Sequence, residues 1–137
     1  MPNVKLAMAR RLITYHLDNS LNPYDSNFVT VLSSFLNWNL NNPIAGIDAK
    51  YFRWFDSGDL QDQRMMHKIR AIAEKCPKVS FWLPTREWFL IFGEEVPPNL
   101  MVRYSTPMVD VLSRVQNSTM VFSSLDVLPD NCAACPA

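Results

Sequence analysis

The chain has 137 residues, the usual length of one globular domain, and its hydrophobic content of 48% excludes an intrinsically disordered protein. Its 13 basic and 13 acidic residues give a formal net charge of zero, which excludes a strong overall attraction to nucleic acid or to an anionic membrane but leaves room for a local basic patch. Residues 1–20 mix basic and polar side chains with apolar ones, so they resemble neither a signal peptide nor a membrane span, and we expect a cytoplasmic protein.

Two helices are predicted in the N-terminal part of the chain, residues 1–48. Apolar residues recur every three or four positions between residues 4 and 17, which is the helical period. A second helix is predicted to begin after Pro23, with Asp25 or Ser26 as its N-cap. The sequence NLNNPIAG ends it, because Asn, Pro and Gly favour turns.

The next part, residues 49–125, alternates β-like and helical runs. KYFRWF, KVSFWLPT, NLMVRYST and STMVFSSL each have the composition of a strand. A helix is predicted over residues 59–76, with Met65, Ile69, Ile72 and Cys76 on one side. REWFLIFGEE is predicted as a short helix or structured loop, and PMVDVLSRVQ as one or two helical turns.

This alternation is typical of βαβ units and hence of a parallel sheet. We expect a single α/β domain with an open, mostly parallel four-stranded sheet and flanking helices. The two N-terminal helices are predicted to pack against the sheet, which would form an incomplete, TIM-like barrel. Residues 126–137 are predicted to be an irregular tail.

Polar residues gather where the predicted strands end, and parallel sheets bind their ligands at that edge. Gly58 permits a tight turn, and Asp59 is placed to cap the helix that follows. Asp56, predicted as the last strand residue, needs either a cation or a ligand. The candidate pocket residues are Arg53, Asp56, Ser57, Gly58, Asp59, Thr85, Arg86, Glu87, Arg103 and Ser105.

Two interpretations of these polar residues remain open. The first is a structural network of ion pairs among Arg53, Arg103, Asp56 and Glu87, since a guanidinium in a buried strand needs a carboxylate or several carbonyls as partners. The second is a pocket for a charged small molecule or for a peptide of a partner protein.

The three cysteines give no disulfide framework, because their number is odd and Cys76 falls in a predicted helix. Cys132 and Cys135 have a Cys-x-x-Cys spacing, but a structural zinc site needs four ligands and a redox motif of this kind normally opens a helix. We therefore expect reduced thiols, no cofactor and no metal, with zinc at Cys132 and Cys135 as the minority alternative.

Three motifs point to a known family. FRWFDSGDLQ, FWLPTREW and PPNLMVRYST followed by MVD, in this order and at this spacing, resemble the phage gene-product-eighty-eight family, proteins encoded by bacteriophages and related mobile elements. The resemblance runs from roughly Val4 to Cys135. It implies a distant similarity to radical S-adenosylmethionine enzymes, in which a partial (β/α) barrel carries an iron–sulfur cluster.

By position, DSGD would correspond to the motif of those enzymes that contacts the amino group of S-adenosylmethionine, and PTRE to the end of their third strand. Longer family members carry a cysteine-rich segment upstream of this region, whereas no cysteine here precedes Cys76. Because a cluster needs three or four converging thiolates, we expect neither a cluster nor radical chemistry.

Two functional hypotheses follow. The first is a non-catalytic, phage-encoded accessory protein of the host bacterial cytoplasm that binds a host or phage protein complex, in the manner of an anti-CRISPR or anti-restriction inhibitor; nucleic acid is the less favoured partner. The chain has more large aromatic residues, Trp82 among them, than its core obviously needs. The candidate residues for the partner surface are Arg10, Arg11, Trp38, Trp88 and Phe89.

The second hypothesis is an enzyme or enzyme fragment that binds a small charged ligand, such as S-adenosylmethionine or a nucleotide, at the strand ends. The sequence contains no nucleophile elbow and no glycine-rich phosphate loop, since it has only three, widely separated glycines.

Overall fold

The computed structural model of the chain describes residues 5–7, 9–10, 13–14, 21–55, 59–109 and 118–121. Residues 5–7, 9–10 and 13–14 are helical, in the region of the first predicted helix. The other elements, in which η denotes a 3-10 helix, are η1 (Pro23–Asp25), α2 (Asn27–Asn41), β1 (Tyr51–Arg53), α3 (Gln63–Lys75), β2 (Ser80–Thr85), η2 (Trp88–Leu90), β3 (Leu100–Val109) and β4 (Ser118–Val121).

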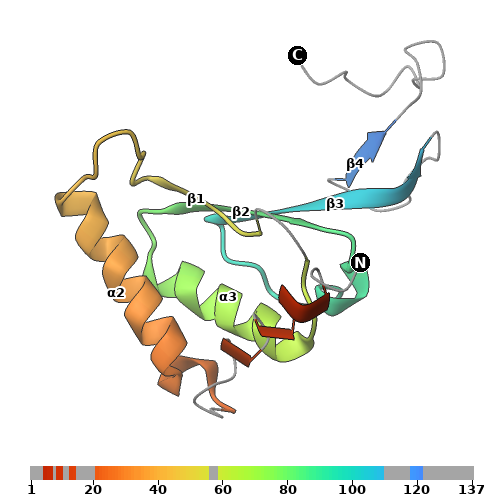
Figure 1. The fold of residues 1–137 in the computed structure, drawn as a ribbon, viewed down its shortest axis with the longest axis horizontal. Coiled ribbons are helices and arrows are strands. Elements are labelled where there is room, and N and C mark those ends of the chain that lie inside the picture. The colour runs from red at the N-terminus through yellow and green to blue at the C-terminus, as the bar shows by residue number, and fades with distance from the viewer. Residues whose placement is uncertain are drawn as a thin grey trace.

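The strands form an open, all-parallel sheet whose spatial order, β1-β2-β3-β4, is the order of the chain (Figure 1). Phe52 lies opposite Phe81, and Phe81 lies opposite Leu100. The second half of β3 pairs with β4 on its other side, beginning at Tyr104, which lies opposite both Thr85 of β2 and Ser118 of β4. The predicted α/β class with an open parallel sheet is confirmed, but the described strands do not show the incomplete barrel that we expected.

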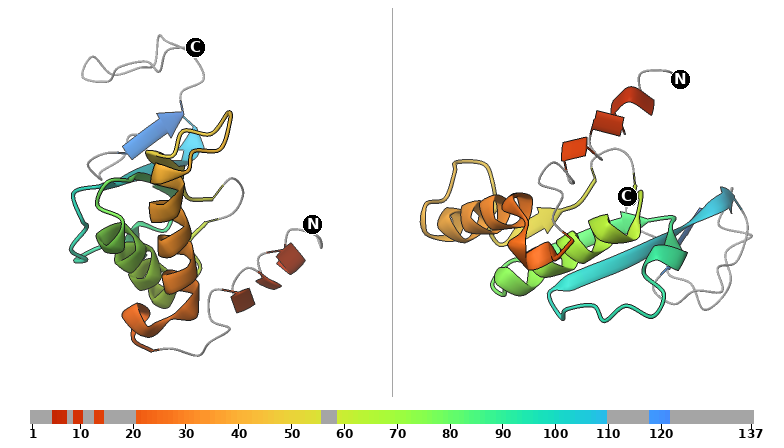
Figure 2. Two further views of the ribbon diagram at one scale, coloured as in Figure 1. Left: turned by 90° about the vertical axis from the view of Figure 1, so that its left-hand side faces the viewer. Right: turned by 90° about the horizontal axis from the view of Figure 1, so that it is seen from below.

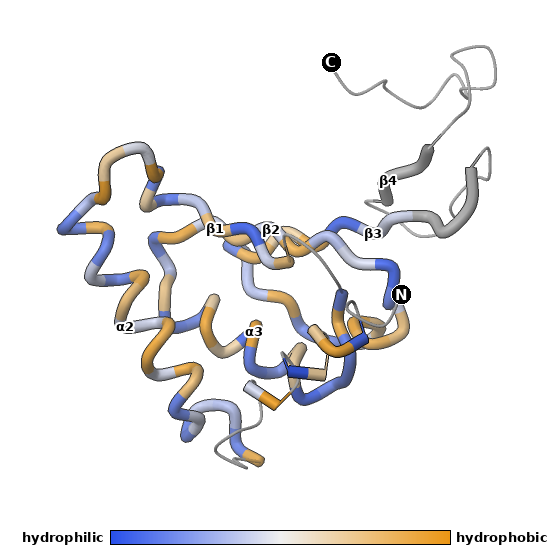
Figure 3. Tube along the Cα trace, in the orientation of Figure 1, coloured by the Kyte–Doolittle hydropathy of each residue, from blue (hydrophilic) through white to orange (hydrophobic). Residues whose placement is uncertain are grey.

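Both long helices lie on the same face of the sheet (Figures 1 and 2). Apolar residues recur along them and along the strands (Figure 3), as the amphipathic pattern predicts. The predicted apolar side of α3 is confirmed: three of its side chains and that of the residue after the helix are completely buried, and they pack against strand residues that are also buried. These core residues are Met65, Ile69, Ile72, Cys76, Phe81, Leu83 and Leu100.

The helix starts follow from side-chain capping. The Ser26 side chain accepts a hydrogen bond from the Val29 backbone N–H at 3.5 Å, which confirms one of the two predicted caps of α2. The cap of α3 is Asp62, whose Oδ1 accepts from the Met65 N–H at 2.8 Å. The prediction that Asp59 caps this helix is wrong, because the carboxylate of Asp59 lies too far ahead of the first turn and bonds elsewhere.

Asp62→Ala is expected to lower the free energy of unfolding by about 1 kcal/mol, because it leaves an N–H group of the first turn of α3 without its acceptor. Urea denaturation followed by circular dichroism would measure this change. Asp25, which was the other predicted cap of α2, has an exposed side chain, so Asp25→Ala is the matched control. Equal losses in the two variants would contradict the assignment of Asp62 as the cap.

Two strands have bounds different from those predicted. β1 ends at Arg53, because Phe55 adopts a left-handed backbone conformation with φ of 54° that a strand cannot continue through. Asp56 is therefore not the last residue of this strand. β3 continues to Val109, which lies opposite Val121 of β4, so residues 107–109 are extended and not helical as predicted.

Candidate functional site

Asp59, Thr85 and Arg86 meet at the C-terminal edge of the sheet. Oδ1 of Asp59 accepts hydrogen bonds from the Leu60 backbone N–H at 2.7 Å and from the Thr85 hydroxyl, and Oδ2 accepts from the Arg86 backbone N–H at 2.7 Å. Thr85 is buried, and its hydroxyl oxygen accepts from the Glu87 N–H at 3.0 Å. We call this arrangement the Asp59 clamp, because it ties the segment before α3 to the end of β2.

The other predicted pocket residues are only partly brought together. Arg86 has an exposed side chain and Glu87 a half-buried one, both beside the Asp59 clamp. Ser105 lies opposite Thr119 in the middle of β3, because this strand continues beyond it. Three of the predicted pocket residues lie outside the described residues: Asp56, Ser57 and Gly58.

Arg53 is the last residue of β1, whereas Arg103 lies in the interior of β3. Strand alternation places both on the face of the sheet that points away from α2 and α3. Among the described residues, neither guanidinium forms an ion pair with Glu87. Within the described residues, the predicted ion pairs of Arg53 and Arg103 with Glu87 are therefore not formed.

A second polar cluster, which sequence reasoning missed, surrounds Glu94 in the loop before β3. Its Oε1 accepts from Gln63 Nε2 at 2.5 Å and lies 3.0 Å from His67 Nε2, and its Oε2 accepts from Arg70 Nη1 at 2.8 Å. The spacing of Gln63, His67 and Arg70 places them on one side of α3. Helical periodicity could have grouped these three, but nothing in the sequence indicated Glu94.

Burial raises the pKa of Glu94, but the hydrogen bond and charge of His67, the charge of Arg70 and the hydrogen bond from Gln63 lower it by more. The resulting pKa lies below the ordinary value of 4.5. A carboxyl group whose pKa is lowered by folding stabilises the protein fully above its ordinary pKa. This stabilisation is lost as the pH falls through the lowered pKa.

Glu94→Gln should therefore lower the free energy of unfolding by about 1 kcal/mol near neutral pH. The difference from the parent protein should shrink as the pH falls below about 4.5, where the parent loses the same charge. Urea denaturation at pH 7 and pH 3.5 would measure it. Glu95→Gln, which changes an exposed neighbour, is the control. A deficit of Glu94→Gln that is the same at both pH values would contradict the role of the charge.

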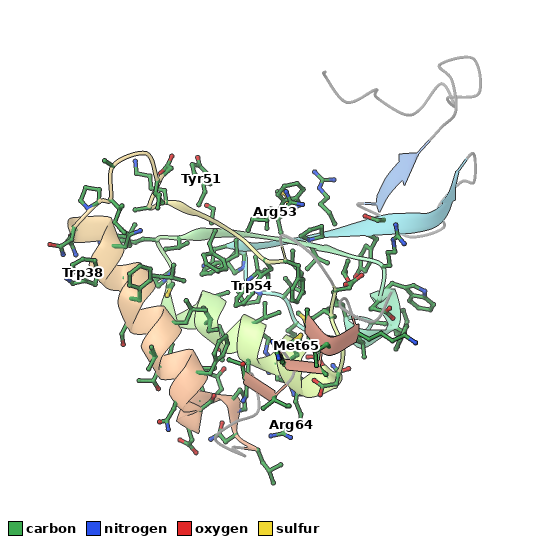
Figure 4. The ribbon with its side chains drawn as sticks, viewed as in Figure 1. Trp38, Tyr51, Arg53, Trp54, Arg64 and Met65 are labelled. Atoms are coloured by element: carbon green, nitrogen blue, oxygen red, sulfur yellow. The ribbon has the colours of Figure 1, made fainter. Side chains whose placement is uncertain are left out.

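The face of the sheet opposite α2 and α3 carries large exposed side chains. Tyr51, Trp82 and Met101 are 67%, 43% and 56% exposed. Arg53, Trp82 and Met101 lie opposite one another on three neighbouring strands, and the Arg53 guanidinium carbon lies 4.8 Å from the centre of the Trp82 ring. Figure 4 shows Tyr51 and Arg53 on this side, whereas Trp54 and Met65 lie between β1 and α3.

No helix of the described residues covers this face (Figures 1 and 2). We call it the uncovered face. It is unusual, because the sheets of α/β proteins with parallel strands are normally buried on both sides. Strand alternation assigns to it Tyr51, Arg53, Ser80, Trp82, Pro84, Met101 and Arg103.

A second group of exposed aromatic residues projects from η2 and the turn after it. Trp88, Phe89 and Phe92 are half to four-fifths exposed, and the Trp88 ring contacts the other two edge to face. We call these three residues the η2 aromatic group. Trp38, on α2, is exposed as well, and so is Arg10, whereas Arg11 lies outside the described residues.

The family model of Gene product 88 matches residues 1–133 of the chain. The chain belongs to the Gene product 88 family. No curated protein and no solved structure matches this Gene product 88 chain. The predicted similarity to radical S-adenosylmethionine enzymes therefore has no support from a known fold.

In the part of the Gene product 88 chain that the structure describes, no helix is long and apolar enough to cross a membrane. The same part contains no group of three or more His, Cys, Asp or Glu side chains arranged to hold a metal. Cys76 is buried, and its thiol donates a hydrogen bond to the Ser33 carbonyl at 3.4 Å. Both observations fit a structural role for this residue. Cys132 and Cys135 lie outside the described residues.

Proposed function

We propose that this Gene product 88 protein is a phage-encoded accessory protein without catalytic activity that binds a macromolecule of the host or the phage in the host bacterial cytoplasm. The observation that carries the proposal is the exposure of aromatic side chains in two groups, on the uncovered face and in the η2 aromatic group. Exposed apolar groups of this kind mark interaction surfaces in soluble proteins.

The residue types support binding in preference to chemistry. Tyr, Trp and Arg are enriched among the residues that dominate interface energies, because they offer large, stiff or planar contact areas. Both groups include a tryptophan, and the uncovered face adds two arginines. Counter-defence of the anti-CRISPR or anti-restriction type is the process in which we place the protein, by association with other small phage proteins.

A tagged pull-down from the lysate of a defence-competent bacterial host tests the proposal, with proteins identified by mass spectrometry and nucleic acids by sequencing. We expect a stoichiometric partner that is lost with Trp82→Ala or with Trp88→Ala. Leu21→Ala removes an exposed apolar side chain outside both groups and should leave capture unchanged. An empty pull-down, or equal capture by all variants, would contradict the proposal.

The alternative is an enzyme or enzyme fragment that binds a small charged ligand at the sheet edge. The observation in its favour is that four of the predicted pocket residues lie together there: Asp59, Thr85, Arg86 and Glu87. The carboxylate of Asp59 already accepts from three donors of the protein, so the alternative depends on Asp56 and on the side chains of Arg86 and Glu87.

This alternative predicts that saturating S-adenosylmethionine or nucleotide raises the melting temperature, because a ligand that binds only the folded state stabilises it. Asp56→Ala should abolish that shift and leave the melting temperature without ligand unchanged. No shift with any of these ligands would remove the alternative. The relationship to a partial barrel is a proposal that belongs to this alternative alone.

A further inference from the structure

We propose that the uncovered face binds single-stranded DNA, with bases stacked at Tyr51 and Trp82 and phosphates held by Arg53 and Arg103. The inference rests on the proposed function, because it names the macromolecule that this surface recognises. It also revises the expectation from the net charge of the chain, which made nucleic acid the less favoured partner.

The arrangement of the rings is the first argument. Trp82 is in the middle strand of the three that pack on the helices, and its neighbours across the sheet are Arg53 and Met101. A base stacks on an aromatic ring or on a guanidinium plane alike. The Arg53 guanidinium lies over one face of the Trp82 ring, and Trp82 stays 43% exposed, so a base can contact the rest of this ring. Tyr51 adds a second ring on the neighbouring strand, and it is the more exposed of the two.

The charge of the face is the second argument. Its described residues include the guanidinium groups of Arg53 and Arg103 and no carboxylate. A second copy of the chain docked on the same face would bring guanidinium groups together. A neutral apolar peptide would bury them without a partner, which is costly. An anionic partner that also has flat rings satisfies both the guanidinium groups and the aromatic residues.

Exposed aromatic rings favour single-stranded over double-stranded nucleic acid as the partner. In a duplex the faces of the bases are stacked on one another, whereas in a single strand they are accessible to protein rings. Met101 and Pro84, which flank Trp82, offer no hydrogen-bond donor to a ribose 2′-hydroxyl, and the hydroxyl groups of the face belong to Tyr51 on β1 and to Ser80 at the start of β2. For this reason we commit to DNA and not to RNA.

Fluorescence anisotropy with a labelled oligothymidylate of about 12 nucleotides, a length within the usual site size of stacking domains, tests the inference on the full chain. Trp82→Ala should weaken binding about tenfold or more, in line with the loss of one base stack. Trp38→Ala removes a tryptophan on α2 that is somewhat more exposed than Trp82, and it should leave binding unchanged. Circular dichroism would establish that both variants remain folded.

A salt series measures the phosphate contacts. In the variant that combines Arg53→Gln and Arg103→Gln, the slope of the logarithm of the affinity against the logarithm of the salt concentration should become shallower by about 1.4, since each phosphate contact with a single strand contributes about 0.7. Binding that is insensitive to salt, or that falls equally with Trp38→Ala, would overturn the inference. So would a tighter complex with duplex DNA or with the matching RNA.

Two further results separate this inference from the proposed function. A protein partner captured from lysate through Trp88, together with no binding of the oligonucleotide, would leave the proposed function standing and refute the inference. A dimer in analytical ultracentrifugation that Trp82→Ala dissociates would also refute it, because the face would then be occupied by a second copy.

Discussion

Asp59→Ala is expected to lower the free energy of unfolding by about 3 kcal/mol, which is more than an average substitution of a partly buried polar residue. The carboxylate accepts from two backbone N–H groups and from the Thr85 hydroxyl. Thr85 is only 2% exposed, so its hydroxyl cannot turn to water when the carboxylate is removed. Urea denaturation at neutral pH would measure the change.

Asp59→Asn is the informative companion, because its amide oxygen keeps one acceptor and loses the charge. We expect an intermediate loss of stability for this variant. A stable Asp59→Ala protein would show that the Asp59 clamp is not structural, and Asp59 would return to the set of ligand groups that the alternative function needs. A large loss leaves that function to the other residues of the sheet edge.

Phe81→Ala is expected to lower the free energy of unfolding by about 4 kcal/mol, the usual cost of removing a buried phenyl ring and leaving a cavity. Phe81 is 2% exposed, and its ring centre lies 5.7 Å from that of Phe52 and 6.4 Å from that of Trp54. The ring belongs to the middle of the layer between the sheet and the helices. Thermal and urea denaturation would both report the loss.

The next residue along the strand is the matched control. Trp82→Ala removes a larger ring, but one on the uncovered face, so we expect it to cost less than about 1 kcal/mol. Destabilisation of Trp82→Ala by as much as Phe81→Ala would show that this face is covered in the folded protein. Both proposals that use the uncovered face would then lose their basis.

Periodicity predicted the helical core well. The spacing of Met65, Ile69 and Ile72 identified the buried side of α3, because a helix of this amphipathic kind has one stable orientation on a sheet. Ser26 was found as a cap because capping is local in sequence. The alternation of strands and helices gave the parallel sheet for the same reason, since short connections leave few arrangements.

Features that depend on distant contacts were not predicted. Asp59 was predicted to cap α3, which begins four residues later, whereas its partner Thr85 lies on β2. The early end of β1 follows from the left-handed backbone at Phe55, a residue type that rarely adopts it. The alternation of side chains in β2 could have predicted that Trp82 and Phe81 lie on opposite faces of the sheet. It did not predict that one face is uncovered, because parallel sheets are normally buried on both sides.

The strand order has a consequence for how the protein is made. Each strand after β1 pairs with the strand that precedes it in the chain, so that partner has already been made when the new strand is synthesised. Domains form as units from the N-terminal side during synthesis. We therefore expect the sheet to grow on the ribosome in the direction of translation, with β1 waiting only for β2 and with β3 aligning on a strand pair that is already complete.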